Sequence, residues 1–165
     1  MRDYQEQVKA FQEKLRAAET PSETQSAILR AMDAKQREEL QRLDRRIELD
    51  EEDGEAYWER GKLYYFANDY AQALEDFTKA KELGMEDSTL YWYKGFCYRR
   101  LGETELAIRE YSRSLELKET SEVYRNRGLC FTTVKLYDKA VLDFTRAIKL
   151  PPGDKRLYRE RGSAY

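Results

Sequence analysis

The fold is decided by the stretch AYWERGKLYY at residues 56–65, because close copies of it follow along the chain. The copies are LYWYKGFCYR at 90–99, VYRNRGLCFT at 123–132 and LYRERGSAY at 157–165. Their glycines, Gly61, Gly95, Gly128 and Gly162, are 34, 33 and 34 residues apart. In each copy an aromatic residue stands four positions before the glycine, and another stands three positions after it. A regular period of this length indicates a repeat architecture.

A second block follows each of the first three copies: AQALEDFTKAKEL at 71–83, TELAIREYSRSLEL at 104–117 and DKAVLDFTRAIKL at 138–150. Apolar or small residues recur three and four positions apart in both blocks, as they do on the buried face of a helix. Turn-forming residues separate the blocks. Each unit therefore predicts two helices, and at about 12–15 residues each helix is too short to be stable alone. We expect the glycines to let the first helix approach the second closely.

These residues resemble the tetratricopeptide repeat, a helix-turn-helix unit of 34 residues. The resemblance covers residues 54–165 and implies an all-α fold, a right-handed superhelical solenoid of antiparallel helix pairs. In this family the first helix of each pair lines a concave surface. The chain departs from the family pattern in two ways. Pro152 alone keeps the closing proline, and the residue before each glycine is basic instead of apolar.

The repeat pattern divides the chain into units at 54–87, 88–120 and 121–154, with 155–165 as the first helix of a further, truncated unit. We expect that last helix to expose Tyr158 and Tyr165. Its face is therefore either covered by a longer protein, of which this chain is a piece, or used for assembly with another copy.

Residues 1–53 contain no glycine and predict long helices. A first helix is defined by one stripe, formed by Tyr4, Val8, Phe11, Leu15 and Ala18. Thr20-Pro21-Ser22-Glu23 predicts the start of a second helix with a capping box. Its stripe continues to Ile47, so residues 20–53 form either one continuous helix or a degenerate repeat that turns near Asp33. We expect the first helix to pack on the second instead of in the groove, because a short connection favours antiparallel neighbours.

The basic residue before each glycine has an acidic counterpart sixteen positions later. Because the two helices of a unit are antiparallel, these positions meet across the turn. The sequence predicts three ion pairs, Arg60–Asp76, Lys94–Glu110 and Arg127–Asp143. The alternative is two solvated faces that never touch.

The composition argues against catalysis. The chain has no histidine, which removes the usual general base and metal ligand. Cys97 and Cys130 lie at equivalent places in successive repeats, where helices about 10 Å apart are too distant for a disulfide, so we expect free, structural thiols. The acidic run at 50–53 lacks the spacing of a calcium loop. We therefore predict no enzyme, no catalytic residue, no metal and no cofactor.

Residues one step around the first helices from the glycine column are expected to face the concave side. The predicted partner-binding residues are Trp58, Lys62, Tyr65, Trp92, Phe96, Arg99, Arg125, Asn126 and Arg159, with Leu129 and Thr132 beside them. Aromatic residues and arginine dominate binding hot spots. The alternative is that Trp58, Trp92 and Phe96 simply pack against one another.

Charge rises along the chain: residues 1–53 and 54–87 each carry −4, residues 88–120 carry +1 and residues 121–165 carry +5. This favours an acidic protein or peptide ligand with apolar residues, or head-to-tail contacts between copies. RNA is disfavoured by a pI near 5.5. We predict a scaffold that binds a peptide or partner protein in its concave groove. The alternatives are a self-assembling structural module and a regulatory domain of a larger enzyme.

The resemblance also bears on one ligand class. Family members that clamp the C-terminal carboxylate of heat-shock chaperones use lysine, asparagine and arginine on three successive first helices. In the corresponding places this chain has Trp58, Lys62, Tyr93, Glu122 and Asn126. We therefore do not expect a chaperone tail. With no apolar run of the roughly 20 residues that a membrane span needs, we expect a soluble, cytoplasmic protein.

Overall fold

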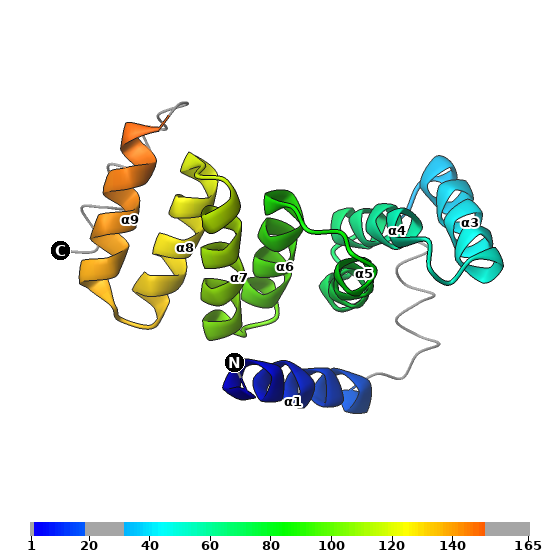
Figure 1. Cartoon of the computed structure of the whole chain (residues 1–165), viewed down its shortest axis with the longest axis horizontal. Coiled ribbons are helices and arrows are strands. Elements are labelled where there is room, and N and C mark those ends of the chain that lie inside the picture. The colour runs from blue at the N-terminus through cyan, green and yellow to red at the C-terminus, as the bar shows by residue number, and fades with distance from the viewer. Residues whose placement is uncertain (1, 19–31, 151–165) are drawn as a thin grey trace. The chain divides into compact units, whose positions relative to one another are not determined.

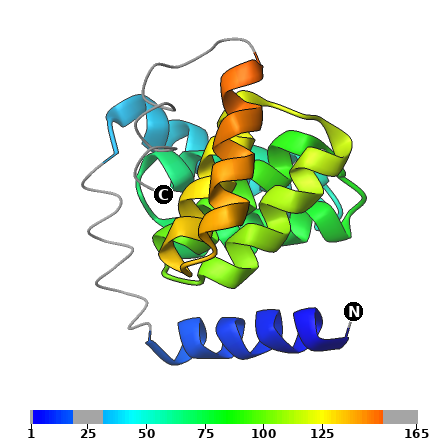
Figure 2. The ribbon, with the colours of Figure 1, turned by 90° about the vertical axis from the view of Figure 1, so that its left-hand side faces the viewer.

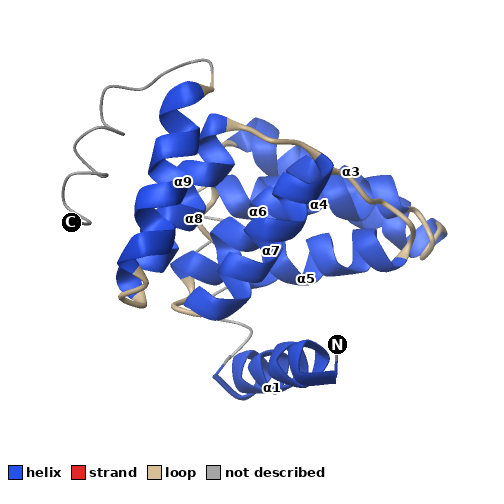
Figure 3. Ribbon diagram, turned by 60° about the vertical axis from the view of Figure 1, so that its left-hand side comes forward, coloured by secondary structure: helices blue, strands red, loops and turns tan. Residues whose placement is uncertain are grey.

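The computed structural model describes residues 2–18 and 32–150, and everything it describes is helix or loop (Figure 3). The helices are α1 (Arg2–Ala18), α3 (Ala34–Leu49), α4 (Gly54–Phe66), α5 (Tyr70–Glu82), α6 (Ser88–Arg100), α7 (Thr104–Leu117), α8 (Ser121–Thr133) and α9 (Tyr137–Lys149). The predicted all-α fold of paired helices is confirmed. None of the described helices has the length and hydropathy that crossing a bilayer requires.

The chain forms two compact units, residues 1–85 and residues 86–165. In the first unit α3 packs on α4, and α4 pairs with α5. In the second unit α6 pairs with α7, α8 pairs with α9, and α7 packs on α8. Figures 1 and 2 show these four helices side by side, each pair joined by a tight turn. Each repeat unit is therefore the helical hairpin that its sequence predicts.

The glycine column sets the distance between the two helices of each pair. A Cβ atom added at Gly61 would come within 2.7 Å of the Phe77 ring, and one at Gly128 within 2.6 Å of the Phe144 ring. At Gly95 the same atom would meet the Tyr111 ring at 2.8 Å. These rings are almost fully buried. The glycines thus let the two helices approach closely, as predicted, and the aromatic residue of the second helix occupies the space that the missing side chain leaves.

The turn inside each pair has the same backbone in all three repeats. Asn68, Gly102 and Lys135 occupy equivalent positions, and their φ angles are 63°, 87° and 60°. The residue that follows each of them donates a backbone hydrogen bond back to the helix, to Tyr64, Tyr98 or Phe131, at 2.8–2.9 Å. This is the six-to-one bond of a Schellman ending. Only glycine adopts the left-handed region without cost, and Lys135 therefore holds a strained backbone.

The N-terminal part agrees with the prediction for the first helix and corrects the second stripe. Residues 2–18 form α1, in which Phe11 is buried. The stripe through Met32 and Gln36 is interrupted, because Asp33 is extended and caps α3 with a reciprocal capping box to Gln36. Of the two interpretations left open for residues 20–53, one continuous helix is therefore wrong, and the chain turns near Asp33 as the other expected. The predicted cap at Thr20 lies outside the described residues, and the packing of α1 on a second helix stays a prediction.

Helix α3 is amphipathic and begins the core of the first unit. Leu43 and Ile47 form a buried cluster with Ala56 of α4, and Tyr57 and Leu63 pack against it. The turn before α4 is fixed by Asp53, whose carboxylate accepts the Ala56 backbone N–H and pairs with Arg46. The acidic run at 50–53 therefore contributes a helix cap and an ion pair.

Candidate functional site: the face of α6 and α8

The three predicted ion pairs are confirmed. In the first repeat the Arg60 guanidinium donates to both carboxylate oxygens of Asp76, at 2.9 and 2.7 Å. In the third repeat Arg127 donates to both oxygens of Asp143, at 2.7 and 2.8 Å. In the second repeat Lys94 Nζ lies 3.3 Å from Glu110 Oε1. The acid of each pair is buried, so these pairs connect the interiors of the helix hairpins and are not offered to a ligand.

Each arginine also makes a bond that the sequence did not predict, to the helix that precedes its own. Arg60 Nη1 donates to Asp44 of α3 at 2.9 Å. Arg127 Nη1 donates to the Ser112 hydroxyl of α7 at 2.9 Å. Asp44 stands sixteen residues before Arg60 and Ser112 fifteen before Arg127, and this spacing is the signal that could have found them. One guanidinium therefore joins three successive helices.

The cysteines are structural. Cys97 and Cys130 are free, fully buried thiols, which confirms the prediction that they form no disulfide. Burial raises the pKa of the Cys130 thiol to about 12, although the nearby charge of Arg99 lowers it. A thiol with such a pKa is protonated at neutral pH and is a poor nucleophile.

The predicted binding residues of the first unit lie on α4 and are half-buried. The Trp58 ring packs on Phe77 of α5, with ring centroids 5.3 Å apart. Lys62 Nζ lies 5.4 Å from the centre of the Trp58 ring and 2.7 Å from Glu59. Tyr65 packs edge-on against Phe66 and Tyr70. These contacts are largely internal to the hairpin, so this face offers few groups that lack a neighbour.

In the second unit the predicted residues form a continuous row along α6, here called the α6 row: Trp92, Phe96 and Arg99. The Trp92 and Phe96 rings are 5.7 Å apart, and the Arg99 guanidinium lies over Phe96, 5.0 Å from the ring centre. All three side chains are half-buried, whereas Tyr91 and Tyr98 of the same helix are 2% and 1% exposed. Trp92 and Phe96 thus pack on each other, as the alternative reading expected, and still keep exposed surface.

Arg99 is the unusual member of the α6 row. Its Nε atom is buried and makes no hydrogen bond within residues 2–18 and 32–150, and no carboxylate of those residues pairs with it. The guanidinium lies near the hydroxyl of Tyr111. Burial raises the pKa of Tyr111, and the positive charge of Arg99 opposes part of that rise. A partly desolvated cation without a carboxylate is costly, so Arg99 favours an anionic ligand group.

Helix α8 lies next to α6 and presents the other predicted residues. Arg125, Leu129 and Thr132 are half-buried. Asn126 is only 5% exposed, and its amide donates to the backbone oxygen of Glu122 at 3.0 Å. Asn126 is thus less accessible than a ligand-binding amide needs to be. Arg159 lies outside the described residues.

A hollow of about 330 Å³ opens at the N-terminal ends of α6 and α8. Its lining includes Trp92 and Tyr93 of α6, Ser114 of α7, Lys118 in the connection that follows α7, and Glu122 and Val123 of α8. Sequence reasoning missed this hollow, because its lining comes from three helices of two repeats. Trp92 belongs both to the hollow and to the α6 row, so the two features are continuous.

Residues 58–122 match the sequence family described as tetratricopeptide repeat. Solved structures of the same fold extend this likeness beyond those residues. The chain superimposes on the crystal structure of YrrB with a TM-score of 0.75, at 27% identity, over 79% of this chain and 68% of that one. Residues 58–122 of the chain therefore belong to the tetratricopeptide repeat family.

Other solved tetratricopeptide structures resemble it at lower identity. The second such domain of human RPAP3, determined in complex with the HSP70 peptide SGPTIEEVD, is 21% identical over 66% of this chain and 91% of that one, with a TM-score of 0.61. MamA from Desulfovibrio magneticus RS-1 is 18% identical over 79% and 75%, with a TM-score of 0.73. YrrB is described as having an unusual peptide-binding site. No curated protein sequence matches the chain.

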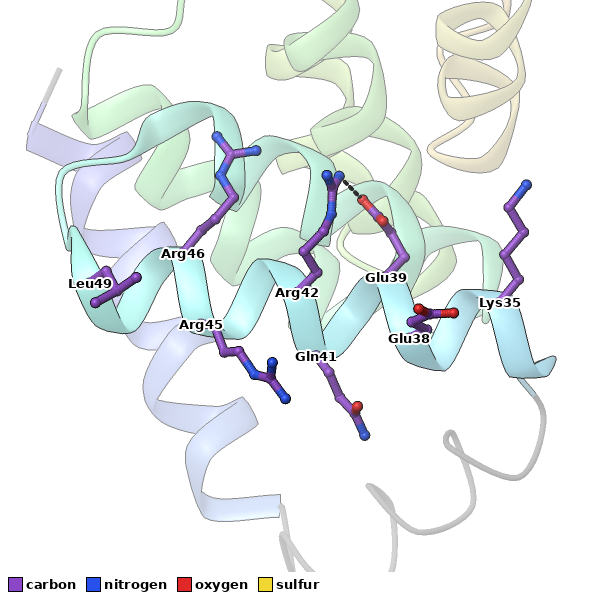
Figure 4. Close-up of a pocket in the computed structure, with 8 residues that line it drawn as sticks. All are labelled: Lys35, Glu38, Glu39, Gln41, Arg42, Arg45, Arg46 and Leu49. Atoms are coloured by element: carbon purple, nitrogen blue, oxygen red, sulfur yellow. Dashed lines mark hydrogen bonds and ion pairs between the residues drawn. The ribbon is translucent and has the colours of Figure 1, made fainter.

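A second hollow, of about 620 Å³, borders α3, but its described lining comes from that helix alone. Figure 4 shows that the side chains spread around α3: Arg42 and Arg46 extend to one side, whereas Gln41 and Arg45 extend to another. Arg42 pairs with Glu39 of its own helix. Because these side chains do not converge, we do not treat this hollow as a ligand site.

Proposed function

We propose that this tetratricopeptide protein is an adaptor that binds an acidic peptide segment along the α6 row. The observation that carries the proposal is the Arg99 guanidinium, half-buried and without a carboxylate in the described part of the chain. A ligand carboxylate would supply the charge-assisted hydrogen bonds that this group lacks. Trp92 and Phe96 beside it supply aromatic surface of the kind that dominates binding hot spots.

The comparisons support an interaction role in general. A tetratricopeptide fold whose structural neighbours include peptide-bound domains is suited to protein–protein interaction. The peptide bound to RPAP3, SGPTIEEVD, is acidic. The clamp that the family uses for chaperone tails is not matched at Trp58, Tyr93 or Glu122 of this chain. We therefore propose that Arg99 binds the acidic group here, and that the ligand is not a chaperone tail.

The test is selection of a random peptide library, displayed on phage, against the full chain. Enriched peptides are then synthesised, and their affinity is measured by fluorescence anisotropy. We expect them to carry Asp or Glu together with an apolar residue, and we expect Arg99→Gln to weaken binding about tenfold without changing the melting temperature. The matched control is Arg100→Gln, the exposed neighbour on α6. Equal binding to wild type, Arg99→Gln and Trp92→Ala would contradict the proposal.

Self-assembly is a second candidate, because α9 and the residue that precedes it expose apolar side chains where the equivalent positions of the other repeats are polar. Leu142 is 52% exposed, and its equivalents are Glu75 and Arg109. Leu136 is 44% exposed, and its equivalents are Asp69 and Glu103. Exposed apolar side chains at these positions fit a contact with a second copy of the chain. Light scattering after size-exclusion chromatography should then give a dimer for wild type and a monomer for Leu142→Arg; a monomeric wild type would exclude it.

A further inference from the structure

One face of α9 combines positive charge with an exposed leucine. Four exposed side chains of this helix share an arc of about 80°, and they are here called the α9 stripe: Lys139, Leu142, Arg146 and Lys149. Lys139 Nζ lies 5.7 Å from the centre of the Phe131 ring, and the Arg146 guanidinium lies 5.6 Å from that of Tyr124. No carboxylate of the described residues pairs with the three cations of the stripe. The stripe therefore offers both charge and apolar surface to a partner.

A helix that continued the array of repeats would not cover the α9 stripe. In the preceding repeat the positions that correspond to its last three members are Arg109, Arg113 and Glu116. These three residues stay exposed although α8 packs on α7. The same face of α9 is therefore turned away from the place of a following helix, and a partner of the stripe comes from outside the array.

The complementary surface lies where α3 ends. Leu49, the last residue of α3, is 89% exposed. Its neighbours in the sequence are exposed acids, which with Leu49 are here called the α3 end: Glu48, Asp50, Glu51 and Glu52. None of these acids pairs with a cation of the described residues. One turn earlier stand Arg45 and Arg46, of which Arg46 pairs with Asp53. The α3 end thus carries net negative charge, to which the carbonyl end of the helix adds.

Charge decides which surfaces are able to meet. Two α9 stripes would bring their cations together, and two α3 ends would bring their acids together, so neither surface pairs with its own kind. An anionic membrane would attract the stripe but repel the α3 end, because residues 1–53 and 54–87 each carry −4. A stripe that meets the α3 end of another copy instead places Leu142 against Leu49, with opposite charges around them.

We infer that copies of this chain associate head to tail, with the α9 stripe of one copy on the α3 end of the next. The inference rests on the self-assembly proposed above and gives it a direction. Because the two surfaces differ, the contact is heterologous, and a dimer keeps one unused stripe and one unused α3 end. Further copies therefore add as the concentration rises, and the dimer is the first step of a series.

The test uses two variants of the full chain, each of which removes one surface. Leu142→Glu/Lys149→Glu removes the stripe, and Leu49→Lys/Glu52→Lys removes the α3 end. Sedimentation equilibrium gives the average mass from about 10 μM to about 1 mM. We expect wild type to exceed the mass of a dimer, each variant alone to stay at the monomer mass of 19.7 kDa, and an equimolar mixture to form dimers. Recovery in the mixture also shows that both variants are folded.

Two further measurements test the chemistry of the contact. Leu117→Lys/Glu105→Lys makes the same two changes at exposed positions of α7 and should associate as wild type does. Raising NaCl from about 50 mM to about 500 mM should weaken the association of wild type about fivefold, because the contact pairs opposite charges. Loss of association in the α7 variant, or no effect of salt, would overturn the inference.

The remaining outcomes separate this inference from self-assembly in general. A wild-type mass that stops at the dimer, with Leu49→Lys/Glu52→Lys still dimeric, overturns the head-to-tail contact and leaves self-assembly through α9 in place. Two monomeric variants that do not recover when mixed also overturn it. A monomeric wild type over the whole range overturns both. If that monomer sediments with phosphatidylserine vesicles and Leu142→Glu/Lys149→Glu does not, the partner of the stripe is a membrane.

Discussion

The second and third repeats place the same kind of ion pair at the same position with different geometry. Arg127 donates two hydrogen bonds to Asp143 and a third to Ser112 of the preceding helix, and its side chain is 15% exposed. Lys94 faces Glu110 through a single nitrogen, at 3.3 Å, and its side chain is 3% exposed. A guanidinium can donate hydrogen bonds to an acid in its own repeat and to a group on the preceding helix at the same time. Lysine and arginine are therefore not equivalent here.

The largest effect should come from removing the acid of the more buried pair. Glu110→Ala leaves Lys94 buried beside an empty space, and we expect it to lower the free energy of unfolding by about 3–5 kcal/mol. Asp143→Ala should cost less, about 2 kcal/mol, because Arg127 keeps Ser112 and some exposure to water. Urea unfolding followed by circular dichroism measures both. The double variant Lys94→Met/Glu110→Leu is the control and should remain within about 1 kcal/mol of wild type. If Asp143→Ala lowered the free energy of unfolding more than Glu110→Ala does, the proposed difference between the two pairs would be wrong.

The repeats also differ in a buried tyrosine, and this difference should make their stability respond differently to alkaline pH. Three positions after the glycine the first two repeats have Tyr64 and Tyr98, whereas the third has Phe131. Burial raises the pKa of Tyr64 to about 12 and also raises that of Tyr98. The folded state binds these protons more tightly than the unfolded state does. The protonated tyrosines therefore contribute their full stabilisation of the fold below pH 10, the unfolded pKa, and this stabilisation is lost as pH rises from 10 toward 12. For Tyr64 the loss is about 1.4 kcal/mol per pH unit in that window.

The measurement is the free energy of unfolding at pH 8, 10 and 11, for wild type and Tyr64→Phe. We expect the variant to lose less stability than wild type above pH 10. The control is Tyr137→Phe, which removes the hydroxyl of a residue that is 46% exposed and should leave the slope as it is. If Tyr64→Phe has the wild-type slope, Tyr64 does not contribute to the alkaline transition.

A smaller effect should follow when the third bond of each arginine is removed. Ser112→Ala should cost about 1–2 kcal/mol, because it deletes a hydrogen bond to a charged group. Asp44→Ala, which removes the corresponding acceptor of Arg60, should cost less than about 1 kcal/mol, because the Asp44 side chain is 42% exposed. Thr133→Ala is the control, since its hydroxyl bonds only to the backbone oxygen of Leu129 in the described structure. Equal losses for Ser112→Ala and Thr133→Ala would mean that the bond to Arg127 adds nothing.

The smallest effect concerns the turns. Lys135→Gly should raise stability by about 1 kcal/mol, because glycine takes the left-handed conformation without the penalty of a side chain. Asn68→Gly should gain less, since asparagine tolerates this region. Thermal unfolding measures both changes. Gly102→Ala, the opposite substitution at the equivalent turn, should lower the melting temperature. A lower melting temperature for Lys135→Gly would contradict the explanation.

The ion pairs could be predicted from sequence for a geometric reason. Each pair is symmetric about its turn: Arg60 and Asp76 each lie eight residues from Asn68. A tight turn places equidistant positions at the same height on antiparallel helices, so spacing alone indicates contact. The acceptors on the preceding helix, Asp44 and Ser112, depend on how consecutive repeats pack. A single repeat does not contain that information.

The helix break at Asp33 and the hollow show two further limits. The apolar stripe keeps its period across Asp33, so periodicity alone favoured one helix, although the pair Asp33 and Gln36 has the spacing of a capping box. On α6 the rule of one step around the helix selected Trp92, Phe96 and Arg99, whose side chains contact one another in a row. That rule predicts which face of the helix a side chain is on, but it does not predict how far the side chain is buried. It therefore did not show that Asn126 is almost fully buried.

Each arginine has one partner in its own repeat and one on the preceding helix, and duplication or loss of a repeat would affect these two partners differently. The partner sixteen residues later lies in the same unit, so duplication of the unit carries Arg127 and Asp143 together. The third acceptor belongs to whatever unit comes before, as Asp44 and Ser112 illustrate. Shuffling the units would keep every internal pair and change every bond between neighbours. The third bond of each arginine therefore depends on which helix precedes its repeat, whereas the ion pair within the repeat does not.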